Sequence, residues 1–190
     1  MPVAAVELKS PQEIALMRDA GAIVAATLRV LSQAVAPGMT TAELDRIAAS
    51  ETAKRGAKPA FLHYRGYPAT LCVSVNEEVV HGIPRAAKAL KAGDIVSLDF
   101  GVILKGFFAD AAVTVPVGKV APGVAALVEA TRESLHKGIE QMQPDKRIGD
   151  ISAAVQQYVE AKGYSVVRSF VGHGIGRALH EDPPVPNFGR

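Results

Sequence analysis

The stretch of sequence that decides the fold is DIVSLDFGVILKGFFADAAVTVPV, residues 94–117. Residues Asp94–Leu104 and Phe107–Val117 are rich in Val, Ile, Leu and Phe, which favour extended strands. Lys105-Gly106 between them predicts a tight turn, so the stretch is expected to fold as an antiparallel hairpin. A sheet needs a second layer against its apolar face, which the flanking sequence has to supply.

The hairpin carries two carboxylates, Asp99 and Asp110. If Leu104 faces Phe107 across the turn, Asp99 faces Ala112, and Asp110 becomes its diagonal neighbour on the same face. Two covered carboxylates repel each other unless a cation or a proton lies between them. The pattern therefore predicts a metal site or an acid–base pair, and the alternative is two solvated carboxylates at a sheet edge.

Helices are expected on both sides of the hairpin. Ser10 with Glu13, and Thr40 with Glu43, each form the capping-box pattern that begins a helix. Apolar residues recur at helical spacing after each box. The other predicted elements are strands over Thr70–Asn76 and Ser165–Val171, helices at about Val124–Met142 and Ile148–Lys162, and an irregular Glu181–Arg190.

A weak internal repeat has an offset of about 107 residues. It matches a helix, a proline-containing turn, a second helix and a glycine, through the pairs Pro37–Pro144, Leu44–Ile151, Ala48–Val155 and Gly56–Gly163. Two unrelated helix pairs with similar breaks are the alternative. The second copy stops before any counterpart of the 94–117 hairpin. We therefore expect an α+β fold of two halves, the second incomplete, with a sheet edge able to pair with another chain.

Composition narrows the class of protein. The 190 residues are 48% hydrophobic, which suits a globular domain with a real core. Lys and Arg number 21 against 19 Asp and Glu, without a dense basic run, so direct nucleic-acid binding is not expected. A lone cysteine, Cys72, excludes an internal disulfide. No signal peptide or apolar run of about 20 residues is present, so we predict a cytoplasmic protein without membrane contact.

Histidines mark two glycine-rich stretches. His173 and His180 lie in VGHGIGRALHED, residues 171–182, and His81 opens HGIP, residues 81–84. Imidazole binds metals and transfers protons near neutral pH, although a lone histidine is more often structural. Carboxylates combined with an imidazole favour Mn(II), Fe(II), Co(II) or Zn(II) over a thiolate-type site.

These motifs, in this order and spacing, resemble type I methionine aminopeptidases. The resemblance is carried by His81-Gly82-Ile83-Pro84, the pair Asp99 and Asp110, and Gly172-His173-Gly174-Ile175-Gly176-Arg177. It implies a pita-bread fold with pseudo-twofold halves, and one catalytic domain over residues 1–190 that lacks the C-terminal part of the family's fold. It also implies metal-dependent removal of the initiator methionine from nascent proteins with a small second residue, near the ribosome.

The resemblance also implies roles for individual residues. Asp99, Asp110 and His173 would be metal ligands, His81 would contact the scissile amide nitrogen, and His180 the carbonyl oxygen. The methionine pocket would be lined by Phe61, Tyr64, Tyr67, Cys72 and Leu179. The family uses two divalent metal ions (Co, Mn, Fe or Zn) and two further glutamate ligands that come after the position of Arg190. The resemblance therefore implies that this chain lacks those two ligands, which leaves open whether it is active alone or only when another chain supplies them.

Two other functions remain open from the sequence. A truncated, catalytically impaired homologue would act as a binding module for nascent chains or a partner protein. A prolidase-like peptidase of the same fold would cleave bonds that precede proline. The HGIP motif at His81 argues against the prolidase, but only by resemblance.

Overall fold

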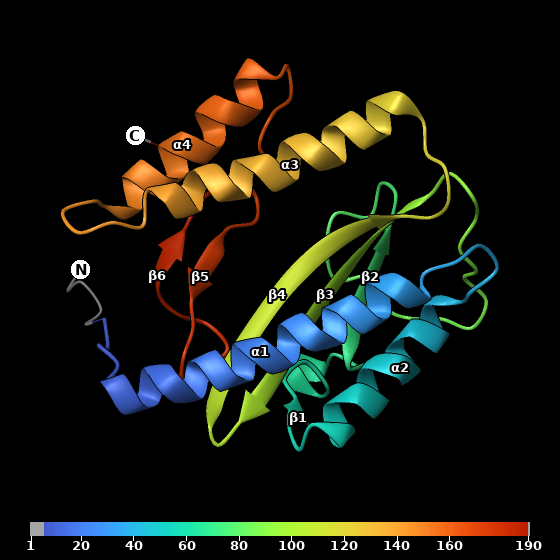
Figure 1. Ribbon diagram of the computed structural model, residues 1–190, viewed down its shortest axis with the longest axis horizontal. Helices are drawn as coiled ribbons and strands as arrows, with labels where there is room; N and C mark the ends of the chain where they lie inside the picture. Colours follow the sequence, from blue (N-terminus) through green and yellow to red (C-terminus); the bar gives the residue numbers. More distant parts are fainter. Residues whose placement is uncertain (1–5, 190) are drawn as a thin grey trace. The chain divides into compact units, whose positions relative to one another are not determined.

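The computed structural model describes residues 6–189 and divides into two compact units. The N-terminal unit comprises residues 7–121 and 175–179, and the C-terminal unit comprises residues 122–174 and 180–189 with Val6. Each unit has its own sheet and its own pair of helices (Figure 1). The single catalytic domain that we predicted over residues 1–190 stays a prediction.

The helices of the N-terminal unit are α1 (Pro11–Ala34) and α2 (Thr41–Lys54), and both begin at the predicted capping boxes. The Ser10 hydroxyl accepts the Glu13 N–H at 3.3 Å, and the Glu13 carboxylate accepts the Ser10 N–H at 2.7 Å. The first turn of α2 repeats both bonds. Each box satisfies backbone N–H groups that a helix leaves without an internal partner.

Four antiparallel strands form the sheet of this unit: β1 (Lys58–Pro59), β2 (Leu71–Val75), β3 (Ile95–Leu104) and β4 (Phe107–Pro116). The central strand β3 pairs with β1 and β2 on one edge and with β4 on the other. The predicted turn is present, with φ of 49° at Lys105 and 86° at Gly106. Positive φ at both residues matches a type I′ turn, whose twist suits the flanking strands.

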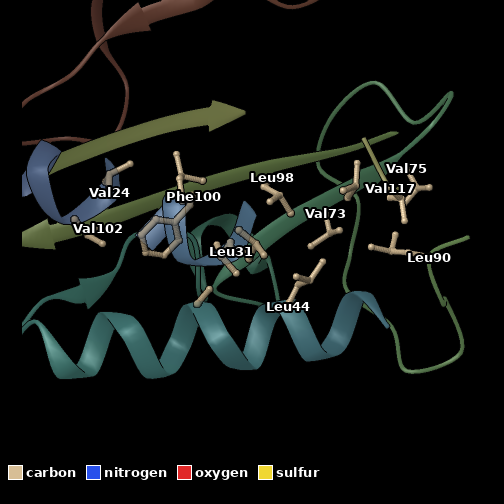
Figure 2. Packing of buried hydrophobic residues seen from close by; sticks show 14 of the residues in the cluster. Val24, Leu31, Leu44, Val73, Val75, Leu90, Leu98, Phe100, Val102 and Val117 are labelled. Atoms are coloured by element: carbon tan, nitrogen blue, oxygen red, sulfur yellow. The ribbon is translucent and has the colours of Figure 1, made fainter. Parts of the chain in front are cut away.

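The core of the N-terminal unit lies between the two helices and one face of this sheet (Figure 2). Buried side chains of the helices, such as Leu31 and Leu44, meet Val73 on β2 and Phe100 on β3. Each fully buried side chain of this kind contributes about 1.5–3 kcal/mol. All five residues of β2 are buried, so its second face is covered as well.

The C-terminal unit contains α3 (Pro122–Glu140), α4 (Ile148–Ala161), β5 (Gly172–Gly174) and β6 (Glu181–Val185). Both ends of α4 lie 107 residues after the ends of α2, as the predicted repeat requires. The two helices pack closely at Gly138, where a Cβ atom would lie 3.0 Å from Cγ2 of Val155. Within residues 6–189, no helix combines the length and the apolar character that a membrane span needs.

Two sequence predictions fail in this unit. Residues 165–171 form no strand, although their side chains suit one, because a strand needs a second strand beside it and none of the strands within residues 6–189 includes or pairs with this segment. Residues 181–185 form β6 instead of an irregular segment. Pro183 and Pro184 argued against a strand because proline has no N–H, but a two-stranded sheet consists only of edge strands, where proline is tolerated.

Candidate active site

The two hairpin carboxylates lie on one face of the sheet, as predicted. Asp99 pairs with Ala112 and Asp110 pairs with Gly101, so the carboxylates are diagonal neighbours. Both residues are half-buried. The glycine at position 101 leaves space here, because a Cβ atom would lie 2.9 Å from the Phe61 ring and 3.1 Å from Cβ of Asp110.

Cys72 on β2 pairs directly with Asp99. It therefore shares a sheet face with the two carboxylates, while Leu71 and Val73 point into the core. Burial raises the pKa of the Cys72 thiol to about 11, and the negative charge of Asp99 adds to the rise. The thiol is consequently protonated at neutral pH, so Cys72 does not present a thiolate nucleophile.

All five predicted pocket residues gather in one cluster of the N-terminal unit. Phe61, Cys72 and Leu179 are buried in it together with Ala60, and the half-buried residues packed against them are Tyr64, Tyr67, Ile103, Phe108 and Ile175. The cluster joins five segments of the chain: residues 60–67, β2, β3, β4 and residues 175–179. Its role as a methionine pocket stays a prediction.

A network of hydrogen bonds holds the edge of this cluster. The Tyr67 hydroxyl lies 3.0 Å from the carbonyl oxygens of both Leu71 and Gly82, which share its single proton. Burial raises the pKa of Tyr67, which keeps the hydroxyl a donor. One oxygen of Asp45 on α2 accepts the N–H groups of Thr70 and Leu71, each at 2.9 Å. Sequence reasoning missed Asp45, because no local pattern signals a partner 25 residues away.

His81 is exposed and has a left-handed backbone, with φ of 60°. The next residue, Gly82, is tied to β2: its carbonyl accepts the Val73 N–H at 2.8 Å, and its N–H donates to Ser74 Oγ at 3.1 Å. A Cβ atom on Gly82 would lie 2.2 Å from the Val73 carbonyl oxygen. Only glycine permits this approach, and the approach fixes the backbone beside His81.

The other two histidines of the predicted site, His173 and His180, lie side by side in the C-terminal unit. His173 lies on β5 and His180 directly precedes β6, and their ring centroids are 4.1 Å apart. The His173 Nδ1 atom lies 2.9 Å from the Gly174 carbonyl oxygen. Because a carbonyl oxygen only accepts, Nδ1 is the donor in this contact, and Nε2 is the ring nitrogen that could bind a metal.

The donor types fit a divalent metal ion. Carboxylate oxygens, such as those of Asp99 and Asp110 on one sheet face, and an imidazole nitrogen, such as that of His173, are donors that these metals accept. Within residues 6–189, no group of three or more His, Cys, Asp or Glu side chains forms a ready-made metal site. The assignment of these three residues as ligands therefore stays a prediction, as do the roles of His81 and His180.

Comparison with known proteins defines the class of this chain. Residues 15–190 match metallopeptidase family M24. The methionine aminopeptidase of Clostridium perfringens is 56% identical over 96% of this chain and 73% of its own length. The crystal structure of methionine aminopeptidase from Thermotoga maritima superposes with a TM-score of 0.96 and 45% identity, over 98% of this chain and 75% of that chain.

The chain therefore belongs to metallopeptidase family M24 and has its pita-bread fold. Within that family it is a metallo-aminopeptidase of the methionine aminopeptidase group. Prolidase from Pyrococcus furiosus shares the fold, with a TM-score of 0.84 and 20% identity over 96% of this chain and 52% of that chain. An identity this low shows the fold alone.

Proposed function

We propose that this chain removes the initiator methionine from nascent cytoplasmic proteins whose second residue is small, with the help of divalent metal ions. One observation carries the proposal: the same-face pair of Asp99 and Asp110 adjoins, through Cys72, a buried apolar cluster that holds all five predicted pocket residues. Relatives named methionine aminopeptidase, such as those that are 56% and 49% identical, support it.

The cluster suits a methionine side chain by its chemistry. Phe61 and Tyr64 offer aromatic surface and Leu179 offers aliphatic surface, while the protonated Cys72 thiol adds a small polarisable group. Methionine is unbranched, and its sulfur makes favourable contacts with aromatic rings. Burial of each methylene of such a side chain contributes about 0.8 kcal/mol. A charged or strongly polar first residue would lose its hydration without finding a partner there.

The proposed chemistry assigns a task to each polar residue. A divalent metal ion, when bound by Asp99, Asp110 and His173, supplies Lewis acidity that lowers the pKa of water. The Nδ1 bond of His173 to Gly174 orients Nε2 for that binding. His81 would donate a proton to the scissile amide nitrogen as it leaves, from a backbone position that Gly82 fixes. His180 would donate to the carbonyl oxygen as negative charge develops on it.

The test is hydrolysis of Met-Ala-Ser by the purified chain with Co(II) or Mn(II). Asp110→Asn keeps the size of the side chain and removes its charge, so it should abolish hydrolysis. Asp19→Asn, at an exposed position on α1, is the matched control and should keep full activity. Met-Arg-Ser should be cleaved far more slowly, because its second residue is large.

The other outcomes point to the two alternatives. A folded chain that binds Met-Ala-Ser but does not cleave it would support the binding module. Cleavage of X-Pro dipeptides, with Met-Ala-Ser left intact, would support a prolidase-like peptidase. Either result would overturn the proposed function.

A further inference from the structure

Residues 175–179 reach the N-terminal unit without regular secondary structure. They supply Ile175 and Leu179 to the apolar cluster, and Leu179 is only 3% exposed. The Gly176 carbonyl accepts the Phe108 N–H at 2.7 Å, at the start of β4. A second backbone bond, from Gly176 N–H to the Ala178 carbonyl, lies within the segment. Side chains of the segment add further contacts to the same unit.

The side chain of Arg177 makes polar and aromatic contacts with other parts of the same unit. Its Nη2 atom donates one charge-assisted hydrogen bond to Oε1 of Glu13 on α1, and Nε lies 3.5 Å from a carboxylate oxygen of Glu7. The guanidinium carbon lies 4.8 Å from the ring centroid of Phe107, which is buried. One side chain thus connects residues 175–179 to the start of α1 and to the β3–β4 turn.

The contacts around Arg177 hold its guanidinium in one orientation, and this matters more than the neutralisation of its charge. A single exposed ion pair contributes little, and the Arg177 side chain is 55% exposed. Arginine, however, presents a planar fork of donors to carboxylates and stacks on aromatic faces at the same time. Two carboxylates and one ring around the guanidinium leave it few alternative orientations.

We propose that Arg177 is a positioning residue, which anchors residues 175–179 and thereby holds Leu179 in the wall of the cluster. These Arg177 contacts, called the anchor below, would determine how tightly the cluster encloses the first side chain of a substrate. The inference rests on the proposed function only where the cluster is taken to bind methionine. Arg177 is the last residue of the Gly172–Arg177 motif and lies two residues before Leu179.

Glu13 offers a clean way to test the anchor. Its carboxylate also accepts the Ser10 N–H in the capping box, and this bond, with a smaller effect of Arg177, lowers its pKa. Glutamine is equally suited to that position of a capping box, so Glu13→Gln removes the charge and keeps the cap. Glu43→Gln is the matched control, because Glu43 has the same place in the box of α2 and pairs with Arg46 instead of Arg177.

The first experiment is amide hydrogen exchange followed by NMR on the full chain. Arg177→Ala should speed exchange of the Phe108 amide about tenfold, equivalent to about 1.4 kcal/mol, and leave the β2–β3 amides unchanged. Arg177→Lys and Glu13→Gln should have smaller effects, and Glu43→Gln none. The Leu179 methyl signals should shift in the same order. Unchanged Phe108 exchange, or unchanged Leu179 signals, in all three anchor variants would overturn the inference.

The second experiment separates binding from chemistry. With Met-Ala-Ser, Arg177→Ala should raise KM several-fold at nearly constant kcat, and Arg177→Lys should recover part of the loss. An unchanged KM would contradict the anchor's effect on the cluster. If the unmodified chain does not cleave Met-Ala-Ser, the proposed function fails, whereas the exchange rates and the Leu179 signals still decide whether Arg177 positions the segment.

Discussion

Replacement of Gly82 by alanine should destabilise the N-terminal unit, because the added Cβ meets only backbone. It would lie 2.2 Å from the carbonyl oxygen of Val73, 2.8 Å from its carbonyl carbon and 3.0 Å from Cα of Ser74. Non-bonded carbon atoms prefer separations of about 3.5–4.0 Å. Since β2 is buried along its whole length, it cannot retreat, and the 81–84 segment has to move outward.

The size of the effect follows from the bonds that this movement breaks. Gly82 accepts from Val73 N–H and from the Tyr67 hydroxyl, and it donates to Ser74 Oγ. A net contribution of about 0.5–1.5 kcal/mol for each bond predicts a loss of about 3 kcal/mol. Ser74 is 3% exposed, so its hydroxyl would also be left without water.

Urea unfolding measures this loss as a lower midpoint at constant slope. Gly21→Ala is the matched control, because Gly21 lies within α1 and a Cβ atom added there would have nothing within 4 Å. Alanine there should stabilise the chain by about 0.5–1 kcal/mol. A loss below about 1 kcal/mol for Gly82→Ala would refute the reasoning, since the contact with β2 would then be easily relieved.

Three further predictions concern the same unit. Asp45→Ala should lower the free energy of unfolding by about 2–4 kcal/mol in urea titrations, because the buried N–H groups of Thr70 and Leu71 lose their acceptor; a change below about 1 kcal/mol would contradict this. Gly106→Ala should cost about 1 kcal/mol, measured in the same way, since φ is 86° there, whereas an unchanged midpoint would argue against the turn. Cys72 should react with iodoacetamide slowly at pH 8 and faster only as pH approaches its folded pKa of about 11. Because an unfolded cysteine titrates near about pH 8.5, its contribution to stability should be complete below that pH and lost as pH rises toward 11, and rapid native labelling at pH 8 would disprove the burial.

The parts of the site that the sequence predicted depend on interactions within a few residues. The same-face placement of Asp99 and Asp110 followed from the alternation of strand side chains and from one tight turn at Lys105-Gly106. The helix starts at Ser10 and Thr40 followed from capping boxes that span four residues. Such patterns are legible in the sequence because both partners of each interaction are close along the chain.

The strand predictions in the C-terminal unit failed for the opposite reason. Val167 and Phe170 suit a strand by type, but a strand exists only where a second one pairs with it. Pro183 and Pro184 suit a loop by type, yet they lie on a strand because β5 is beside them. The residue types of a segment therefore show which secondary structures it can adopt, whereas pairing with a second strand determines whether it forms a strand.

The sequence by itself determined the family, the helix starts, the hairpin and the residue types of the candidate site. Only the tertiary structure brought Asp45 to the N–H groups of residues 70 and 71, and Arg177 to Glu13, 164 residues away. Contacts at such separations leave no periodic pattern, because they depend on how whole elements pack and not on the local path of the backbone. The contacts of Asp45 and Arg177 that hold the candidate site could therefore be identified only from the tertiary structure.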